Sequence, residues 1–151
     1  MAEVRRRLTT AGYRVELVDR AIERLLALGI LDDRAFAEAW IASRDRAHPR
    51  GERALRQELF VKGIDRSIAD EILASRRSDQ EGSQGEADHA AAARLLVRNA
   101  RGLERVADPR QRRSRAYALL ARNGFDSETC TEAVRAWMAS VAADAGDDSG
   151  E

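Results

Sequence analysis

The chain has little of what secreted, membrane and disulfide-bonded proteins depend on. Its single cysteine, Cys130, excludes an internal disulfide and a cysteine-based metal site. No apolar run approaches the roughly 18 residues that cross a bilayer. The amino-terminal MAEVRRRLTT also lacks the apolar core of a signal peptide. We therefore expect a cytoplasmic protein with no membrane partner.

Residues that favour β-structure are scarce as well. Aromatic residues make up 5% of the chain, and no segment alternates apolar and polar residues as a half-buried strand does. Charged residues make up 34%, and there are two prolines. Over 151 residues this composition favours an all-helical protein with a small core.

Sequence patterns of catalysis and nucleotide binding are missing too. The chain has no GxxxxGK[ST] loop, and no strand that could precede a GxGxxG turn. Asp32 and Asp33 would point about 100° apart on a helix, so we interpret Asp32 as a helix cap and not as a metal ligand. Neither His48 nor His89 has a nucleophile or ligand at a useful spacing. The sequence predicts a protein that is not an enzyme and needs no cofactor.

The clearest local pattern lies between Leu25 and Ile64. Asp32 stands at the N-cap of a helix that begins at Asp33. Leu31 before the cap and Phe36 four residues after it form the pattern of a hydrophobic staple. Phe36 and Trp40 recur on the apolar face of this helix, so we interpret both as packing residues. A second helix, with Ala54, Leu55, Leu59 and Val61 as its apolar residues, then runs to Gly63.

Three segments align on a glycine. Each has an apolar residue eight positions before the glycine, leucine four before it and a large apolar residue directly after it. The segments are Val4–Tyr13, Leu55–Ile64 and Ala116–Phe125, with Gly12, Gly63 and Gly124 as the aligned glycines. A glycine placed just past a helix end takes a positive φ in the Schellman motif, where the flanking apolar residues touch. The pattern therefore predicts helix ends at these glycines and, by the same rule, at Gly29.

The alignment extends to a repeated three-helix unit. A helix follows each aligned glycine, and one more helix precedes the glycine helix in the second and third copies, so the first copy lacks its opening helix. Stacking of such units would supply the core that each one lacks. We expect an incomplete first repeat over 1–30, a second over 31–75, a flexible linker over 76–87, a third over 88–141 and an acidic disordered tail over 142–151.

The formal net charge of zero hides an uneven distribution. Between residues 91 and 122, nine arginines face two acids, a net charge of +7. Arg94, Arg98, Arg101 and Arg105 have the spacing of one helical ridge opposite Ala93, Leu96, Ala100 and Leu103. If Gly102 ends that helix, only the first three align. A further helix beginning at Asp108-Pro109 adds Arg110, Arg112, Arg113 and Arg115.

Two interpretations of these arginines stay open: solvated helix faces, or a surface for an anionic partner. In the third repeat the arginines repel one another without acidic neighbours, which favours a partner. In the second repeat acids interrupt the arginines, and Glu52 with Arg56 forms an i,i+4 pair, which favours a solvated face. The candidate partner-binding residues are Arg53, Arg56, Arg94, Arg98, Arg101, Arg105, Arg112, Arg113 and Arg115.

The central pattern resembles the RecX family of recombination regulators. The residues that carry the resemblance are Leu31-Asp-Asp-Arg-Ala-Phe36-Ala-Glu-Ala-Trp40, Arg44, Gly51 and Leu55-x-x-Glu58-Leu59-x-x-Lys62-Gly63-Ile64. The third repeat is similar through Asp108-Pro109, Arg112-Arg113 and Leu120-Ala-Arg-Asn-Gly124-Phe125. The resemblance covers residues 4–140, and the richness in arginine resembles an actinobacterial member. The missing opening helix and the long polar segment 76–87 depart from the family pattern.

The resemblance implies tandem three-helix repeats in an elongated, curved monomer without catalytic residues. It also implies binding to the RecA filament on DNA, with inhibition of ATP hydrolysis and strand exchange, and so regulation of recombination, DNA repair and the SOS response. A helix-turn-helix module that binds single- or double-stranded DNA through the third repeat is the main alternative. A helical-repeat adaptor for another protein is a third possibility.

Overall fold

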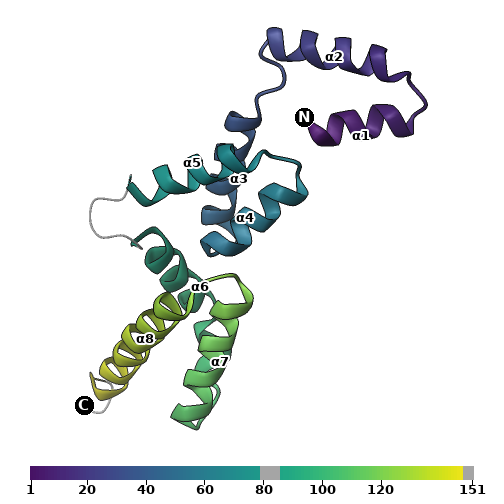
Figure 1. The fold of residues 1–151 in the computed structure, drawn as a ribbon. Coiled ribbons are helices and arrows are strands. Elements are labelled where there is room, and N and C mark those ends of the chain that lie inside the picture. Colours follow the sequence, from purple (N-terminus) through teal and green to yellow (C-terminus); the bar gives the residue numbers. More distant parts are fainter. Residues whose placement is uncertain (79–85, 148–151) are drawn as a thin grey trace.

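A computed structural model of the chain describes residues 1–78 and 86–147. Within these residues the chain forms eight α-helices and no β-strand (Figure 1). The helices are α1 (Ala2–Thr10), α2 (Val15–Ala27), α3 (Asp33–Ala47), α4 (Glu52–Val61), α5 (Arg66–Ser78), α6 (Glu86–Glu104), α7 (Pro109–Arg122) and α8 (Ser127–Asp147). In these residues no helix has both the length and the apolar character that crossing a membrane requires.

The helices form three successive groups, called here the first unit (α1 and α2), the second unit (α3 to α5) and the third unit (α6 to α8). They follow one another in an elongated, curved molecule, with the first unit at one end and the third at the other (Figure 1). The second and third units each open with a helix that the first unit lacks. The predicted all-α fold of tandem degenerate repeats is therefore confirmed.

Four helices end in the same way, at a glycine with a positive φ. The φ angles are 87° at Gly12, 66° at Gly29, 78° at Gly63 and 88° at Gly124. At the end of α4, the N–H of Ile64 donates to the carbonyl of Leu59 (3.0 Å), and the N–H of Gly63 donates to that of Phe60 (2.9 Å). The same pair of bonds closes α1, α2 and α7. These are Schellman motifs, and the predicted helix ends are confirmed.

Aspartate side chains cap the amino-terminal ends of four helices, α3, α5, α7 and α8. Asp32, for example, accepts a hydrogen bond of 2.9 Å from the N–H of Ala35 at the start of α3. Asp65, Asp108 and Asp126 accept equivalent bonds of 2.8–3.0 Å at the starts of α5, α7 and α8. Each carboxylate satisfies a backbone donor that the helix itself leaves unpaired, and the predicted cap at Asp32 is confirmed.

The second and third units each bury their own core. The buried residues of the second unit are Ala37, Ile41, Leu55, Leu59, Ile64, Ala69, Ile72 and Leu73. In the third unit Cys130 and Trp137 lie among a larger set of buried residues from all three helices. Among the described residues of the first unit, only Val18 and Ile22 are buried. Leu17 and Leu26 are 47% and 40% exposed.

The second and third units meet backbone to backbone at two glycines. The N–H of Gly51 donates to the carbonyl of Asn123 at 3.0 Å. A Cβ atom at Gly51 would lie 2.4 Å from the carbonyl carbon of Gly124, and one at Gly124 would lie 2.4 Å from the Cβ of Ala54. No real side chain tolerates such distances, so both positions require glycine for the two units to pack.

Two predicted segment boundaries are wrong. Residues 76–78 and 86–87 of the expected linker belong to α5 and α6, because Arg76 is held by ion pairs and Ala87 is buried. The rest of that segment lies outside the described residues. Residues 142–147 of the expected tail continue α8, where alanine favours a helix. Residues 148–151 also lie outside the described residues.

Three side chains that were assigned to apolar helix faces are exposed. Phe36 is 44% exposed, because α3 turns the next residue, Ala37, into the core instead. Val61 is 70% exposed, since it lies about 200° around α4 from the buried Leu59. Ala93 is exposed as well. Helical periodicity located the buried face of each helix correctly, but it predicted a wider buried face than the structure has.

Candidate partner-binding surface

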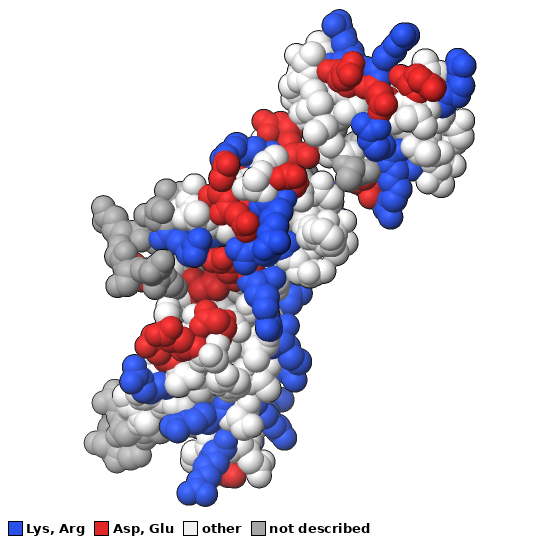
Figure 2. Space-filling view, viewed as in Figure 1, with Lys and Arg blue, Asp and Glu red and all other residues white. Residues whose placement is uncertain are grey.

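Four of the predicted partner-binding arginines form no hydrogen bond or ion pair through their side chains with other described residues. They are Arg101, Arg105, Arg113 and Arg115, called here the arginine surface, and all four are exposed. Because α6 continues through Gly102 to Glu104, Arg101 lies on the helix and Arg105 directly after it. Figure 2 shows basic side chains along the α7 edge of the third unit, with acidic ones gathered towards its junction with the second unit. The arginine surface therefore consists of exposed cations that the described residues leave unpaired.

Arg94 and Arg98, the first two members of the predicted ridge, instead contact the second unit. Arg98 donates to the carbonyl of Arg46 (3.0 Å) and also to that of Ala47, at the end of α3. These carbonyls have no acceptor role inside the helix, so the guanidinium caps α3 from outside. The Nη2 of Arg94 lies 4.0 Å from the Oδ1 of Asp45. The predicted ridge is therefore divided. Arg94 and Arg98 lie at the contact between the second and third units, called here the joint, and Arg101 and Arg105 belong to the arginine surface.

The other candidate arginines also have partners within the chain. Arg112 donates from Nε to the carbonyl of Val106 (3.0 Å), and so ties α7 to the segment after α6. Arg53 donates to the carbonyl of Ala121 at 3.3 Å. Arg56 donates to Asp70 and to Glu52, both at 2.9 Å, and the hydrogen bond with Asp70 above all raises the pKa of Arg56. The predicted i,i+4 pair of Glu52 and Arg56 is confirmed.

A buried ion-pair cluster that the sequence did not suggest joins the two larger units. Arg76 on α5 donates to both carboxylate oxygens of Asp45 on α3 (2.9 and 3.0 Å) and to Asp88 on α6 (2.6 Å). Asp88 also accepts the N–H of Glu52, and so caps α4 from the third unit. Burial disfavours the charge of Arg76, but the hydrogen bonds with both carboxylates outweigh it and raise the pKa of the guanidinium. Arg76 and Asp88 together therefore connect four helices.

Trp40 has a polar role in addition to the packing role that was predicted. Its Nε1 donates to Glu58 at 2.9 Å, and the same carboxylate oxygen accepts a 2.7 Å bond from Arg44. The guanidinium of Arg44 and the ammonium of Lys62 lie 4.5 and 4.7 Å from the centroid of the indole ring. Phe36 stacks on the ring at 6.0 Å between centroids. Trp40 therefore ties α3 to α4 through hydrogen bonds and cation–π contacts.

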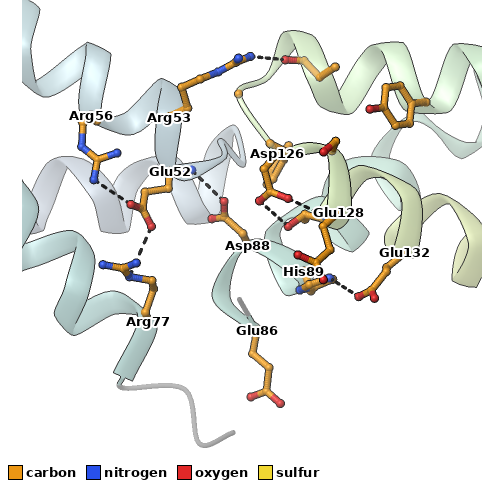
Figure 3. Close-up of a pocket in the computed structure, with 16 residues that line it drawn as sticks. Glu52, Arg53, Arg56, Arg77, Glu86, Asp88, His89, Asp126, Glu128 and Glu132 are labelled. Atoms are coloured by element: carbon orange, nitrogen blue, oxygen red, sulfur yellow. Dashed lines mark hydrogen bonds and ion pairs between the residues drawn. The ribbon is translucent and has the colours of Figure 1, made fainter. Parts of the chain in front are cut away.

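A cleft of about 1140 Å³ opens between the second and third units (Figure 3). On the wall from the second unit, Arg56 and Arg77 both point towards Glu52. On the opposite wall His89 lies 2.8 Å from Glu132, near Asp126. Pockets for small ligands are mostly apolar with a few polar groups, whereas this cleft is lined by charges that are mostly paired within the chain. Its lining therefore does not resemble that of a pocket for a small ligand.

Other chemistry is limited in the part of the chain that the structure describes. There, no group of three or more histidine, cysteine or acidic residues could hold a metal ion. Cys130 is buried, and burial raises the pKa of its thiol, which lowers its reactivity.

Comparisons with known proteins agree with this fold. The model of the RecX second three-helix domain matches residues 32–73, which cover α3, α4 and most of α5. Among solved structures, the crystal structure of RecX from Lactobacillus salivarius has a TM-score of 0.67 at 20% identity, covering 89% of this chain and 82% of that one. A second crystal structure of a regulatory protein RecX also has a TM-score of 0.67, at 22% identity, covering 82% of this chain and 58% of the other. These two likenesses concern the fold.

Several proteins found by sequence comparison are more similar in sequence to this chain than these two structures are. The regulatory protein RecX of Chlorobium phaeobacteroides is 37% identical over 130 residues, covering 86% of this chain and 78% of the relative. That of Mycobacterium tuberculosis is 33% identical over 138 residues, covering 91% of this chain and 77% of the relative. That of Mycolicibacterium vanbaalenii is 31% identical over 144 residues, with 91% and 74% covered. Because this identity and coverage go together with a shared helical architecture, the chain belongs to the RecX family of regulatory proteins.

Proposed function

We propose that this chain binds the RecA recombinase assembled on DNA, and that it lowers ATP hydrolysis and strand exchange without catalysing a reaction itself. The observation that carries the proposal is the family: relatives that match most of this chain bear the name regulatory protein RecX. The arginine surface supports it, because arginine binds carboxylate and phosphate groups bidentately, and a protein filament on DNA presents both.

The arrangement of the units also suits binding along an extended partner such as a filament. An elongated chain of units presents surfaces that are far apart, as the successive subunits of a filament are (Figure 1). The joint at Gly51 and Arg76 fixes the third unit against the second before any partner binds. A surface that is already ordered loses less entropy on binding, which raises affinity. The arginine surface would therefore contact its partner at a set distance from the second unit.

ATP hydrolysis by RecA on single-stranded DNA tests the proposal. The wild-type chain should slow it at ratios from substoichiometric to equimolar. Replacing Arg101, Arg105 and Arg115 together with alanine should raise the half-inhibitory concentration about tenfold, which corresponds to roughly 1.4 kcal/mol of lost binding. These residues were chosen because they have no partner among the described residues, whereas loss of Arg94 or Arg98 would disturb the joint.

A charge-matched control lies in the first unit. Arg14, Arg20 and Arg24 are exposed, and replacing them with alanine removes the same number of charges from another part of the molecule. This variant should inhibit as the wild type does, whereas equal losses in both variants would mean that net charge alone matters. A wild-type chain that leaves the ATPase unchanged would refute the proposed function.

The arginine surface also supports the second candidate, a module that binds DNA directly. If several arginines neutralise phosphates, the logarithm of affinity for bare DNA should fall with the logarithm of salt concentration, with a slope of about −0.7 to −0.9 for each contact. Tight, steeply salt-dependent binding to bare DNA, together with an unchanged RecA ATPase, would favour this candidate. Weak binding to bare DNA with strong inhibition would favour the regulator.

A further inference from the structure

Phe60 and Val61 are the most exposed large apolar side chains among the described residues. They are 72% and 70% exposed, at the carboxyl end of α4. In Figure 2 an uncharged patch lies at the edge of the second unit where α4 ends, with basic side chains beside it. Neighbouring large apolar side chains exposed to water are typical of surfaces that bind another macromolecule. The other two units show which residues the fold accepts at the same positions.

The fold does not require apolar side chains at these two positions. When the units are aligned on their glycines, the first unit has Thr9 and Thr10 there, and the third has Ala121 and Arg122. All three helices nonetheless end in the same pair of Schellman hydrogen bonds. In that motif Phe60 contributes only its backbone carbonyl, to the N–H of Gly63. The side chains of Phe60 and Val61 are therefore available for another role.

The exposed charges of α4 and of the residue that follows it have one sign. The exposed residues of α4 are Arg53, Gln57, Phe60 and Val61, and exposed Lys62 follows them. The acidic residues of the helix are only partly exposed and are paired within the chain. Glu52 lies against Arg56, and Glu58 accepts hydrogen bonds from Trp40 and Arg44. A complementary partner would present apolar side chains beside carboxylates.

We propose that Phe60 and Val61, with Arg53 and Lys62 at the rim, form a docking surface for a protein that presents an apolar contact flanked by acidic side chains. The inference rests on the proposed function and deepens it, because it makes the protein part of the recombinase filament the partner of this surface. A DNA backbone offers phosphates, which the arginine surface can bind, but little apolar area for Phe60. Buried aromatic side chains commonly contribute most to the affinity of protein interfaces.

A double substitution that copies the other units tests the docking surface. Phe60→Ala and Val61→Thr introduce the residues that Ala121 and Thr10 provide at the same positions, so α4 should still form. Val97→Thr is the control, because Val97 on α6 is 68% exposed and lies outside this surface. Binding is measured by co-sedimentation with RecA filaments held on single-stranded DNA by a slowly hydrolysed ATP analogue. Affinity for the same DNA without RecA is measured in parallel.

The double variant should bind the filament at least about tenfold more weakly, the loss expected when a central apolar contact is removed. The control and the affinity for bare DNA should not change. The slope of the logarithm of affinity against the logarithm of salt concentration should also match the wild type, because no charge is removed. Single Val61→Thr, which keeps Phe60, should give a smaller loss and provides the test if the double variant does not fold.

Three results would overturn the proposal. Filament binding by a folded double variant that equals the wild type would exclude these side chains from the interface. A wild-type chain that sediments as a dimer, with the double variant a monomer, would show that the surface joins two copies of this chain. Failure of the wild-type chain itself to bind filaments would refute the proposed function, and is distinguished from the first result by the wild-type measurement alone.

Discussion

Replacing Arg76 with methionine would measure how firmly the second and third units are joined. Methionine keeps an apolar stem of similar length but removes the charge that faces Asp45 and Asp88. The Arg76 side chain is 9% exposed and that of Asp88 11%, so the substitution leaves a nearly buried carboxylate without its cation. Breaking such a pair costs about 3–5 kcal/mol. Because Asp45 is 26% exposed and has Arg94 within 4.0 Å, we expect about 3 kcal/mol.

Urea denaturation followed by tryptophan fluorescence provides the assay. The chain has two tryptophans, Trp40 in the second unit and Trp137 in the third, so variants with only one of them report on each unit separately. With the joint intact, the two transitions should coincide. In the Arg76→Met background they should separate, since neither unit then stabilises the other. Arg66→Met on the same helix is the control, because Arg66 is 86% exposed and its ion pair with Asp70 should contribute less than about 1 kcal/mol.

A second substitution separates the uncompensated charge from lost packing. Asp88→Asn removes the charge of Asp88 but keeps an oxygen that can accept the N–H of Glu52. The double variant with Arg76→Met should be more stable than Arg76→Met alone, because no buried carboxylate is then left without a cation. If Arg76→Met loses as little stability as Arg66→Met, or if Asp88→Asn restores nothing, the buried cluster is not what holds the joint.

Three further predictions concern helix ends and stability. Gly124→Ala should destabilise the protein by about 2 kcal/mol more than Gly12→Ala in urea denaturation, because both have φ near +87° but only Gly124 would clash with Ala54; equal losses would contradict this. Amide exchange should be fastest among the helical regions in residues 4–26, and protection there equal to that of 33–61 would contradict it. Burial of Asp126 opposes its charge, but hydrogen bonds with Thr129 above all outweigh burial and lower the pKa of Asp126. The contribution of Asp126 to the free energy of unfolding is therefore present above the ordinary pKa of 3.8 and is lost as pH falls below it. The difference in urea midpoint between wild type and Asp126→Asn should accordingly shrink from about pH 6 to about pH 3.

The helix ends could be predicted from sequence because their interactions are local. A Schellman motif depends on residues within six positions of one another, and an aspartate cap within three, so Gly63 and Asp32 determine their own surroundings. The buried stripes were predictable for the same reason, through helical periodicity. Their width was not, because the area that a neighbouring helix covers depends on how the helices cross. Phe36 and Val61 lie just outside that area.

The joint depends on contacts that no local pattern announces. Arg76 and Arg77 are adjacent and identical in type, yet Arg76 is nearly buried and Arg77 is 40% exposed. What separates them is the position of Asp45, 31 residues earlier, and of Asp88 beyond the segment that was predicted as a linker. The arginine ridge divides for the same reason. Arg98 reaches the end of α3, which a helical projection of α6 alone does not contain.

The residue before each aligned glycine shows how one repeated fold comes to have unlike joints. The helix ends need only the leucine, the glycine and the apolar residue after it, so this position is free to diverge. In the second unit it is Lys62, which lies over Trp40 within its own unit. In the third it is Asn123, whose side chain accepts a 2.7 Å bond from Arg50 and whose carbonyl accepts the N–H of Gly51. Because the helix end does not constrain this position, its side chain can make a different contact in each unit: with Trp40 inside the second unit, and with Arg50 across the joint in the third.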